Sequence, residues 1–237
     1  MPIFAGSGRA VTDWQASPDR VVVYKSGDWG LLTAGVATAT PGSNHQDMRI
    51  IAGTYRGFHL RSLKGANLRP TSDQMRQTLF DVLGPNIKGS RFLDAYAGSG
   101  AVGLEAYSRG ARTVVFVENH RAAVELIERN LKALDASSLE AVRVLACQVT
   151  TGLERLARED AQFEYVFLDP PYADVAEYHR ALRGLGRSPL VAFESTIIAE
   201  HSRHMRLEPS YGRLEQIRLL RHGDSQLGFY RLNPGGG

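Results

Sequence analysis

Residues 165–172 read Tyr-Val-Phe-Leu-Asp-Pro-Pro-Tyr, an apolar run that ends in a carboxylate, two prolines and an aromatic ring. A proline inside a sheet removes a ladder hydrogen bond, so the strand is expected to end at Leu168. Each proline also disfavours helical backbone at the residue before it, which predicts a stiff, extended corner. In an open α/β sheet, ligands bind at the carboxyl ends of the strands. The stretch therefore presents a candidate site made of Asp169, Pro170 and Tyr172.

The chemistry of this corner suits a planar amine. The Asp169 carboxylate and the Pro170 carbonyl can each accept a hydrogen bond from an exocyclic NH2 group, and Tyr172 can stack on the ring that carries it. Taken alone, the motif is explained equally well as a strand end followed by a Pro-Pro turn. The sequence upstream favours the site.

Residues 91–199 alternate between apolar strands and amphipathic helices, which predicts a mostly parallel sheet. We expect strands at 91–95, 113–117, 141–146, 165–168 and 196–199. Two further alternating segments, 214–220 and 227–232, flank a short polar turn and predict an antiparallel hairpin at the sheet edge. The expected fold is thus α/β and Rossmann-like, with seven strands and a C-terminal antiparallel hairpin.

A glycine-rich turn follows the first expected strand, where Gly98, Gly100 and Gly103 form a G-x-G-x-x-G pattern between a strand and a helix. Such glycines permit a tight turn and aim a helix N-terminus at a ligand. The next strand ends in Glu118, which can accept hydrogen bonds from ribose hydroxyls. Asp94, which precedes the glycines, would repel a pyrophosphate but would favour a sulfonium or an amino group. This favours an S-adenosylmethionine enzyme over a nicotinamide dehydrogenase.

The N-terminal part divides at Met48. Residues 1–47 are rich in small and polar residues, and we expect a flexible or non-native extension whose one plausible strand is 20–24, with a small docked strand region as the alternative. Residues 48–88 are expected to form a β-hairpin and a helix whose basic residues greatly outnumber the acids. Such a surface would attract a polyphosphate such as RNA, with a solvated basic face as the alternative. The basic candidates are Arg49, Arg56, Arg61, Lys64, Arg69 and Arg76. Residues 89–233 would form the main domain and 234–237 a disordered tail.

The amino-acid composition limits the classes to which the protein can belong. The chain has 237 residues, a formal net charge of +3 and a single cysteine, so an internal disulfide is excluded. No apolar run approaches the roughly 20 residues of a membrane span, and no signal peptide is apparent. These features predict a cytoplasmic protein without membrane contact.

The motifs taken together resemble those of the bacterial 16S ribosomal RNA (guanine-N2) methyltransferases, over about residues 48–232. They are Arg-Ile-Ile-Ala-Gly at 49–53, Arg-Pro-Thr at 69–71, the glycine loop at 93–106, Phe-Val-Glu at 116–118 and Asp-Pro-Pro-Tyr at 169–172. The resemblance implies a class I methyltransferase fold and S-adenosylmethionine as donor. It implies a guanine N2 of small-subunit rRNA as acceptor, on free RNA or on the small subunit. We expect a monomer that needs no metal.

Site residues follow from the resemblance by position. Asp169, Pro170 and Tyr172 would hold the base, and Asp94, Gly98 and Gly100 the methionine side of the cofactor. The full set of expected cofactor contacts is Asp94, Ala97, Gly98, Ser99, Gly100, Glu118, Asn119, Gln148 and Asp169. Gln148 stands where relatives usually carry an acid at the adenine amine, so that contact would lack a charge.

Three other functions remain possible from the sequence. An adenine-N6 or other DNA methyltransferase would use the same corner, although no separate target-recognition domain is visible. A non-catalytic RNA-binding protein would keep the fold, but has no need of both Asp169 and Glu118. A dehydrogenase would bind nicotinamide at the glycine loop.

Overall fold

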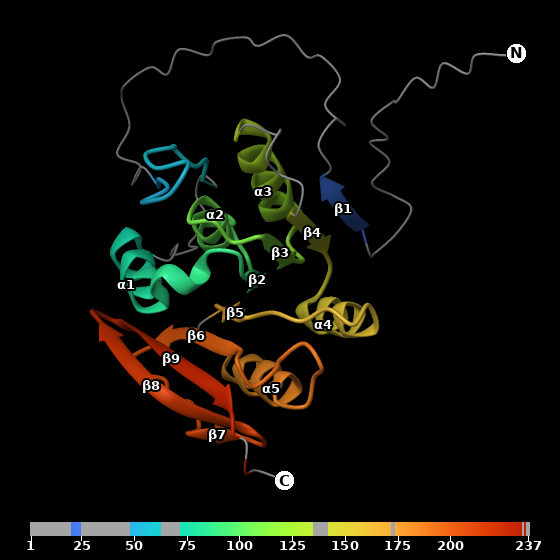
Figure 1. Ribbon diagram of the computed structural model, residues 1–237, viewed down its shortest axis with the longest axis vertical. Coiled ribbons are helices and arrows are strands. Elements are labelled where there is room, and N and C mark those ends of the chain that lie inside the picture. Colours follow the sequence, from blue (N-terminus) through green and yellow to red (C-terminus); the bar gives the residue numbers. More distant parts are fainter. Residues whose placement is uncertain are drawn as a thin grey trace, which may run out of the picture.

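A nine-stranded mixed sheet forms the centre of the molecule, with strand order β1-β4-β3-β2-β5-β6-β9-β8-β7 (Figure 1). The computed structural model describes residues 20–24, 48–62, 72–134, 142–171, 174–233 and 235. Strands β4, β3, β2, β5 and β6 run parallel. Strand β1 pairs antiparallel with β4, and β9, β8 and β7 continue the sheet antiparallel beyond β6.

The strands are β1 (Arg20–Tyr24), β2 (Arg91–Ala95), β3 (Thr113–Glu118), β4 (Val142–Ala146), β5 (Tyr165–Leu168), β6 (Thr196–Ser202), β7 (Ser210–Tyr211), β8 (Leu214–His222) and β9 (Ser225–Leu232). The helices are α1 (Asp73–Leu83), α2 (Ala101–Ser108), α3 (Arg121–Ala133), α4 (Val149–Arg158) and α5 (Val175–Leu185), with a 3-10 turn η1 (Gly84–Ile87) after α1.

Two hydrophobic cores lie on opposite faces of the sheet. Helices α1, α2 and α3 pack on one face together with residues 48–60, around Phe92, Phe116 and Phe167. Helices α4 and α5 cover the other face, where Leu168 and Leu182 are fully buried. The parallel strands are buried on both faces, which explains why their sequences are continuous apolar runs rather than alternating patterns.

Local signals set the helix boundaries. Ser72 caps α1, since its hydroxyl accepts a hydrogen bond from the Met75 amide at 3.1 Å. The helix ends at Gly84, whose φ of 59° leaves the helical region, and Pro85 follows. Helix α3 buries the apolar stripe formed by Val124, Ile127 and Leu131 against the sheet.

The expected count of seven strands is wrong, because β1 and β7 extend the sheet to nine. All seven expected strands are present, including the β8–β9 hairpin. Strand β1 pairs Arg20 with Ala146 and Tyr24 with Val142. The other residues of 1–47 lie outside the described part of the chain.

The expected N-terminal β-hairpin is not confirmed as a pair of strands. The backbone does return antiparallel after residues 53–57, with backbone hydrogen bonds between Ile50 and Phe58 and between Met48 and Leu60. These contacts form one isolated bridge, between Arg49 and His59, and not two strands. The amides of Ile51 and Ala52 donate to the carboxylate of Glu105 on α2 instead of to a facing strand. A side chain of another element therefore replaces part of the hairpin's ladder.

Within the described ranges, no helix combines the length and the apolar character that crossing a bilayer would require.

Candidate active site

The order of the parallel strands creates a switch point between β2 and β5. From β2 the chain continues to β3 on one side, and it later returns to place β5 on the other side. Ligands in open α/β sheets bind at the carboxyl ends of the strands at such a point. The glycine loop follows β2 here, Glu118 ends β3 and Asp169 follows β5, so the fold brings these three predicted features to one edge.

The turn from β2 into α2 is tied to the end of β3. The amides of Tyr96 and Ala97 both donate to the Val117 carbonyl, at 3.0 and 3.1 Å. Tyr96 has a φ of 69°, which is costly for a residue with a side chain. Its hydroxyl donates to Glu177 of α5 at 2.7 Å. Sequence reasoning missed Tyr96, which links the loop to the end of β3 through its amide and to α5 through its hydroxyl.

Gly103 lets α2 approach the sheet closely. A Cβ at this position would lie 2.3 Å from the ring of Phe116 on β3. This is the close helix–strand packing that the third glycine of a dinucleotide-type loop permits. Ala97, Ser99 and Gly100 lie in the turn itself, and the Gly100 amide donates to the Ala97 carbonyl at 2.7 Å.

Asp94 is buried at the base of the loop. Its residue exposure is 2%, and its Oδ2 accepts a hydrogen bond from the Gly103 amide at 2.8 Å. Burial raises the pKa of the Asp94 carboxyl to about 7, helped by the nearby Glu118 carboxylate and opposed by the Gly103 amide. The carboxyl thus anchors α2 to β2. Its expected contact with the cofactor stays a prediction.

Glu118 holds the other side of the loop. Its Oε2 accepts from the Gly98 amide at 2.8 Å and its Oε1 from the His120 amide at 2.7 Å. A carboxylate oxygen can accept more than one hydrogen bond, so both oxygens keep capacity for ribose hydroxyls. Asn119, the next residue, is exposed at this edge.

Gln148 lies one strand further along the same edge. Strand β4 ends at Ala146, opposite Glu118, and Gln148 is exposed at the N-terminus of α4. The position is compatible with the expected adenine contact, which stays a prediction.

The Asp-Pro-Pro corner is fixed from behind by α5. Strand β5 ends at Leu168 as predicted, Asp169 is partly buried and Pro170 is buried. The Pro170 carbonyl accepts a hydrogen bond from the Tyr178 hydroxyl at 3.0 Å. That hydroxyl also lies 2.8 Å from the Glu200 carbonyl of β6. The Pro170 carbonyl is expected to accept a hydrogen bond from the substrate amine. With Tyr178 already donating to it, only its second lone pair remains for that contact. Tyr172 lies outside the described residues.

Segment 48–62 is bound to α2 through a buried carboxylate that sequence reasoning missed. Glu105 has no exposed surface. It accepts from the amides of Ile51 (2.7 Å) and Ala52 (3.0 Å) and from Arg109 Nε (2.6 Å). A lone acid in the apolar run of α2 is the signal that could have identified it.

Two further contacts join segment 48–62 to the core. A Cβ at Gly53 would lie 1.8 Å from the Ser108 carbonyl oxygen, so the backbone touches α2 directly. Asn130 of α3, which is fully buried, accepts from the Arg61 amide at 2.9 Å and donates to the carbonyls of Arg61 and Ser99. The Asn130 side chain therefore forms hydrogen bonds both to segment 48–62 and to the glycine loop.

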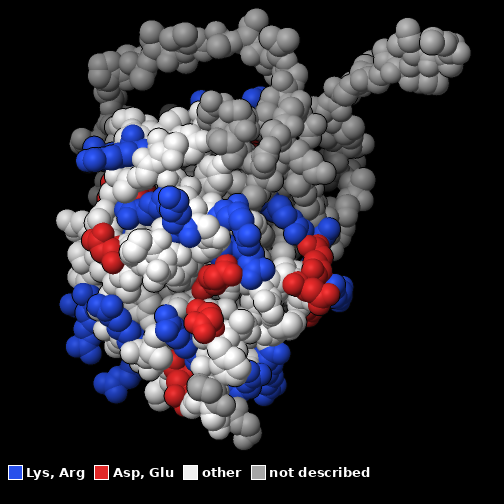
Figure 2. All heavy atoms as spheres, viewed as in Figure 1, with Lys and Arg blue, Asp and Glu red and all other residues white. Residues whose placement is uncertain are grey.

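The basic candidates separate into exposed and buried groups. Arg49, Arg56 and Arg61 are exposed. Figure 2 shows Lys and Arg spread over the viewed face of the molecule, with Asp and Glu among them. Arg76 is the exception, because it is fully buried and donates to the Arg49 carbonyl and to Asp73. The expectation that Arg76 contacts RNA is corrected accordingly. Lys64 and Arg69 lie outside the described residues.

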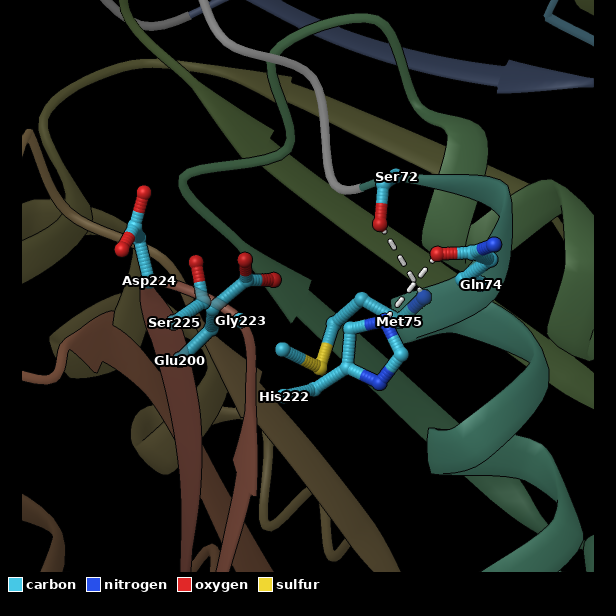
Figure 3. Close-up of a pocket in the computed structure, with 8 residues that line it drawn as sticks. All are labelled: Ser72, Gln74, Met75, Glu200, His222, Gly223, Asp224 and Ser225. Atoms are coloured by element: carbon cyan, nitrogen blue, oxygen red, sulfur yellow. Dashed lines mark hydrogen bonds between the residues drawn. The ribbon is translucent and has the colours of Figure 1, made fainter.

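A pocket of about 220 Å³ opens between the start of α1, the end of β6 and the β8–β9 turn (Figure 3). It is lined by Ser72, Gln74, Met75, Glu200, His222, Gly223, Asp224 and Ser225. His222 Nε2 and Gln74 Oε1 lie 3.2 Å apart. Sequence reasoning did not identify this pocket or Glu200.

Comparisons with known proteins give consistent matches. Residues 48–231 match the family model described as Conserved hypothetical protein 95. The Bacillus subtilis protein YlbH, described provisionally as an rRNA methyltransferase, is 31% identical over 184 residues, covering 78% of this chain and 98% of YlbH. The Haemophilus influenzae ribosomal RNA small subunit methyltransferase D is 40% identical over 126 residues, covering 53% of this chain but only 64% of that relative.

Solved structures agree on the architecture. The Escherichia coli protein yhhF is 29% identical, has a TM-score of 0.67, and the match covers 79% of this chain and 98% of yhhF. The protein SMU.776 in complex with SAH is 15% identical with a TM-score of 0.54, over 67% of this chain and 48% of that one, which shows the fold alone. The α/β methyltransferase fold, with a parallel core and antiparallel C-terminal strands, is thereby established.

Proposed function

The chain belongs to the family described as Conserved hypothetical protein 95, and we propose that it transfers a methyl group from S-adenosylmethionine to the N2 amine of a guanine in small-subunit ribosomal RNA. The observation that carries the proposal is the convergence of the glycine loop, Glu118 and Asp169 at one switch point of the sheet. The relatives named for rRNA methylation support the acceptor class.

The cofactor side of the proposal rests on the glycine loop. Glu118 is held by the Gly98 and His120 amides, and its carboxylate would accept hydrogen bonds from the ribose hydroxyls. Ala97, Ser99 and Gly100 offer close backbone approach, and Asn119 and Gln148 lie beside the expected adenine position. When bound, S-adenosylmethionine supplies an electrophilic methyl group.

The acceptor side rests on Asp169. An aromatic amine is a poor nucleophile because its lone pair is delocalised into the ring. Accepting one amine hydrogen on a fixed carboxylate localises that lone pair and orients it. Since the Pro170 carbonyl already accepts from Tyr178, Asp169 is the principal acceptor and receives the released proton. Tyr172 would stack on the base once it has left its helix or loop.

The RNA side rests on the exposed guanidinium groups of Arg49, Arg56 and Arg61, with Lys64 and Arg69 as further candidates. Phosphate contacts of this kind position a nucleic acid and add affinity without reading sequence. They would offset the few kcal/mol that extruding a base costs.

The experiment that tests the proposal is mass mapping of methylated nucleotides. Small-subunit rRNA transcribed in vitro, free or assembled with ribosomal proteins, is treated with the protein and isotopically labelled S-adenosylmethionine, with duplex DNA in parallel. We expect one N2-methylguanine in the RNA and none with Asp169→Asn. Methylation of DNA adenine alone, or of nothing at all, would contradict the proposal.

A further inference from the structure

Glu200 stands beside Asp169 on the next strand of the sheet. Leu168 at the end of β5 pairs with Ala199 of β6. Extending this register by one residue sets Asp169 beside Glu200, and neighbouring strands lie about 4.8 Å apart. The carboxylate of Asp169, just after β5, and that of Glu200, near the end of β6, are therefore expected at the same level of the sheet.

The alternation of side chains along β5 and β6 assigns Asp169 and Glu200 to the same face of the sheet. On β6, Ile198 belongs to the core under α1–α3, whereas Ala199 belongs to the core under α4 and α5. On β5, Phe167 and Leu168 divide in the same way. Because strand side chains alternate between faces, Glu200 turns toward α1–α3, where it lines the pocket with Met75. If the alternation continues one residue past β5, Asp169 turns to the same face, which also carries Asp94 and Glu118.

The Glu200 carboxylate is reached through the pocket. The residue is only 3% exposed, and in Figure 3 its carboxylate extends from the end of β6 into the space between the Asp224–Ser225 turn and the start of α1. Met75 supplies an apolar wall, and the His222–Gln74 contact closes one side. A flat, partly apolar molecule with hydrogen-bond donors suits such a space.

An ionised carboxylate only accepts hydrogen bonds, so it selects a donor. On its Watson–Crick edge guanine carries two neighbouring donors, N1–H and N2–H. Adenine and cytosine each present a ring nitrogen that accepts beside their amine, which a carboxylate would repel. Two carboxylates on adjacent strands therefore match guanine and exclude adenine.

We propose that Glu200 is the specificity-determining residue of the acceptor site: it accepts N1–H of the extruded guanine while Asp169 accepts N2–H. The inference rests on the proposed function and adds to it the group that chooses the base. The Tyr178 hydroxyl, which lies against the carbonyls of both Pro170 and Glu200, keeps the spacing of the two acids fixed.

The test exchanges single hydrogen-bonding atoms on protein and RNA. Glu200→Gln keeps the shape but offers an N–H, and Asp224→Asn makes the same change at the rim of the same pocket, where Asp224 is more than half exposed. The mapped target guanine is replaced in ligated RNA by 2-aminopurine, which keeps the 2-amine but has an accepting N1. The readout is kcat/KM on each RNA, together with cofactor affinity.

We expect Glu200→Gln to lower kcat/KM on guanine RNA about 10- to 100-fold, the cost of exchanging a charge-assisted acceptor for a donor. On 2-aminopurine RNA the wild-type protein should be poor and Glu200→Gln better, so the guanine/2-aminopurine ratio should invert. Asp224→Asn should leave the ratio unchanged. A ratio is independent of the folded fraction, which guards against misfolding of the variant.

The inference is overturned if Glu200→Gln keeps the wild-type ratio, or if the Asp224→Asn variant shifts it equally. Failure of the proposed function is distinguishable, because the wild-type protein would then not methylate guanine RNA at all. If the wild type is active, Asp169→Asn inactive and Glu200→Gln unchanged, the function stands and only the role of Glu200 falls.

Discussion

The Tyr178 hydroxyl lies 3.0 Å from the carbonyl oxygen of Pro170 and donates a hydrogen bond to it across the back of the candidate site. The same hydroxyl lies 2.8 Å from the carbonyl of Glu200, and Tyr178 itself is fully buried. One side chain of α5 thus connects the corner after β5 with the end of β6. The Asp-Pro-Pro corner is positioned by a residue that itself stays in the protein interior.

Tyr178→Phe should lower both stability and activity. Losing the hydroxyl leaves two buried carbonyls with one donor fewer, which should cost about 1–2 kcal/mol of unfolding free energy. The freed corner should reduce kcat more than it weakens cofactor binding. Urea denaturation and single-turnover methyl transfer measure the two effects.

Tyr230→Phe is the matched control. Tyr230 is equally buried, and its hydroxyl donates to the Glu208 carbonyl at 3.1 Å, away from the corner. It should lose similar stability and keep its rate. Equal loss of kcat in both variants would show that the Tyr178 contact has no special role.

Asp169→Asn should remove methyl transfer almost entirely. An amide cannot take the amine proton, and losing such a group typically costs about 10²- to 10⁴-fold in rate. Cofactor affinity, measured by calorimetry, should change little. Asp174→Asn is the control, because Asp174 caps α5 by accepting from the Glu177 amide and asparagine caps helices equally well. Wild-type turnover by Asp169→Asn would remove Asp169 from the mechanism.

Glu105→Ala should loosen segment 48–62. It leaves the partly buried amides of Ile51 and Ala52 and the Arg109 guanidinium without this carboxylate, and breaking a buried charged contact typically costs about 3–5 kcal/mol. Limited proteolysis should cut within 48–62 first. Glu125→Ala, which breaks only exposed ion pairs with Arg121 and Arg129, should cost less than about 1 kcal/mol.

Asp94 should make stability fall as pH rises. Its pKa is raised by burial from 3.8 to about 7, so the native state holds its proton more tightly than the unfolded chain. The resulting stabilisation is complete below pH 4 and is lost as the pH rises toward 7 and above. Urea midpoints of wild type and Asp94→Asn, compared from pH 4 to 8, should show a difference that depends on pH. Parallel profiles would contradict this.

Reversing Arg56 and Arg61 to glutamate together should weaken RNA binding and flatten its dependence on salt. Each phosphate that the protein no longer neutralises reduces the slope of log K against log salt by about one unit. The Arg61 backbone bonds to Asn130 do not depend on its side chain. Reversing Arg158 and Arg187, which are exposed on the opposite face of the sheet, is the control. Filter binding between low and high salt distinguishes the two pairs.

The sequence allowed the parallel core and the ligand-binding edge to be predicted, because both depend on local signals. The glycine pattern at residues 98, 100 and 103 lies between a strand and a helix. A proline such as Pro170 interrupts a strand whatever its tertiary surroundings are. The tightly buried strands β2, β3 and β5 needed only their apolar runs to be recognised.

Other features depend on contacts between residues distant in the chain and could not be read locally. Glu105 stands out in the sequence only as a lone acid in an apolar run, and its role becomes visible only when segment 48–62, more than fifty positions earlier, is folded over it. In the sequence, Arg76 looks like a surface residue, because Asp73 three positions earlier suggests an ordinary ion pair on the exposed side of a helix. Glu200 lies inside an apolar strand, and only the register with β5 sets it beside Asp169.

Strand β1 covers the outer side of β4 along five paired positions. Without that partner, the backbone donors and acceptors on the outer side of residues 142–146 would form an unpaired strand edge, and such edges invite strand-to-strand association and aggregation. A shortened protein that began at Met48 would keep every candidate residue of the active site but would lose this strand. We expect such a protein to be less soluble while its catalytic chemistry is unchanged.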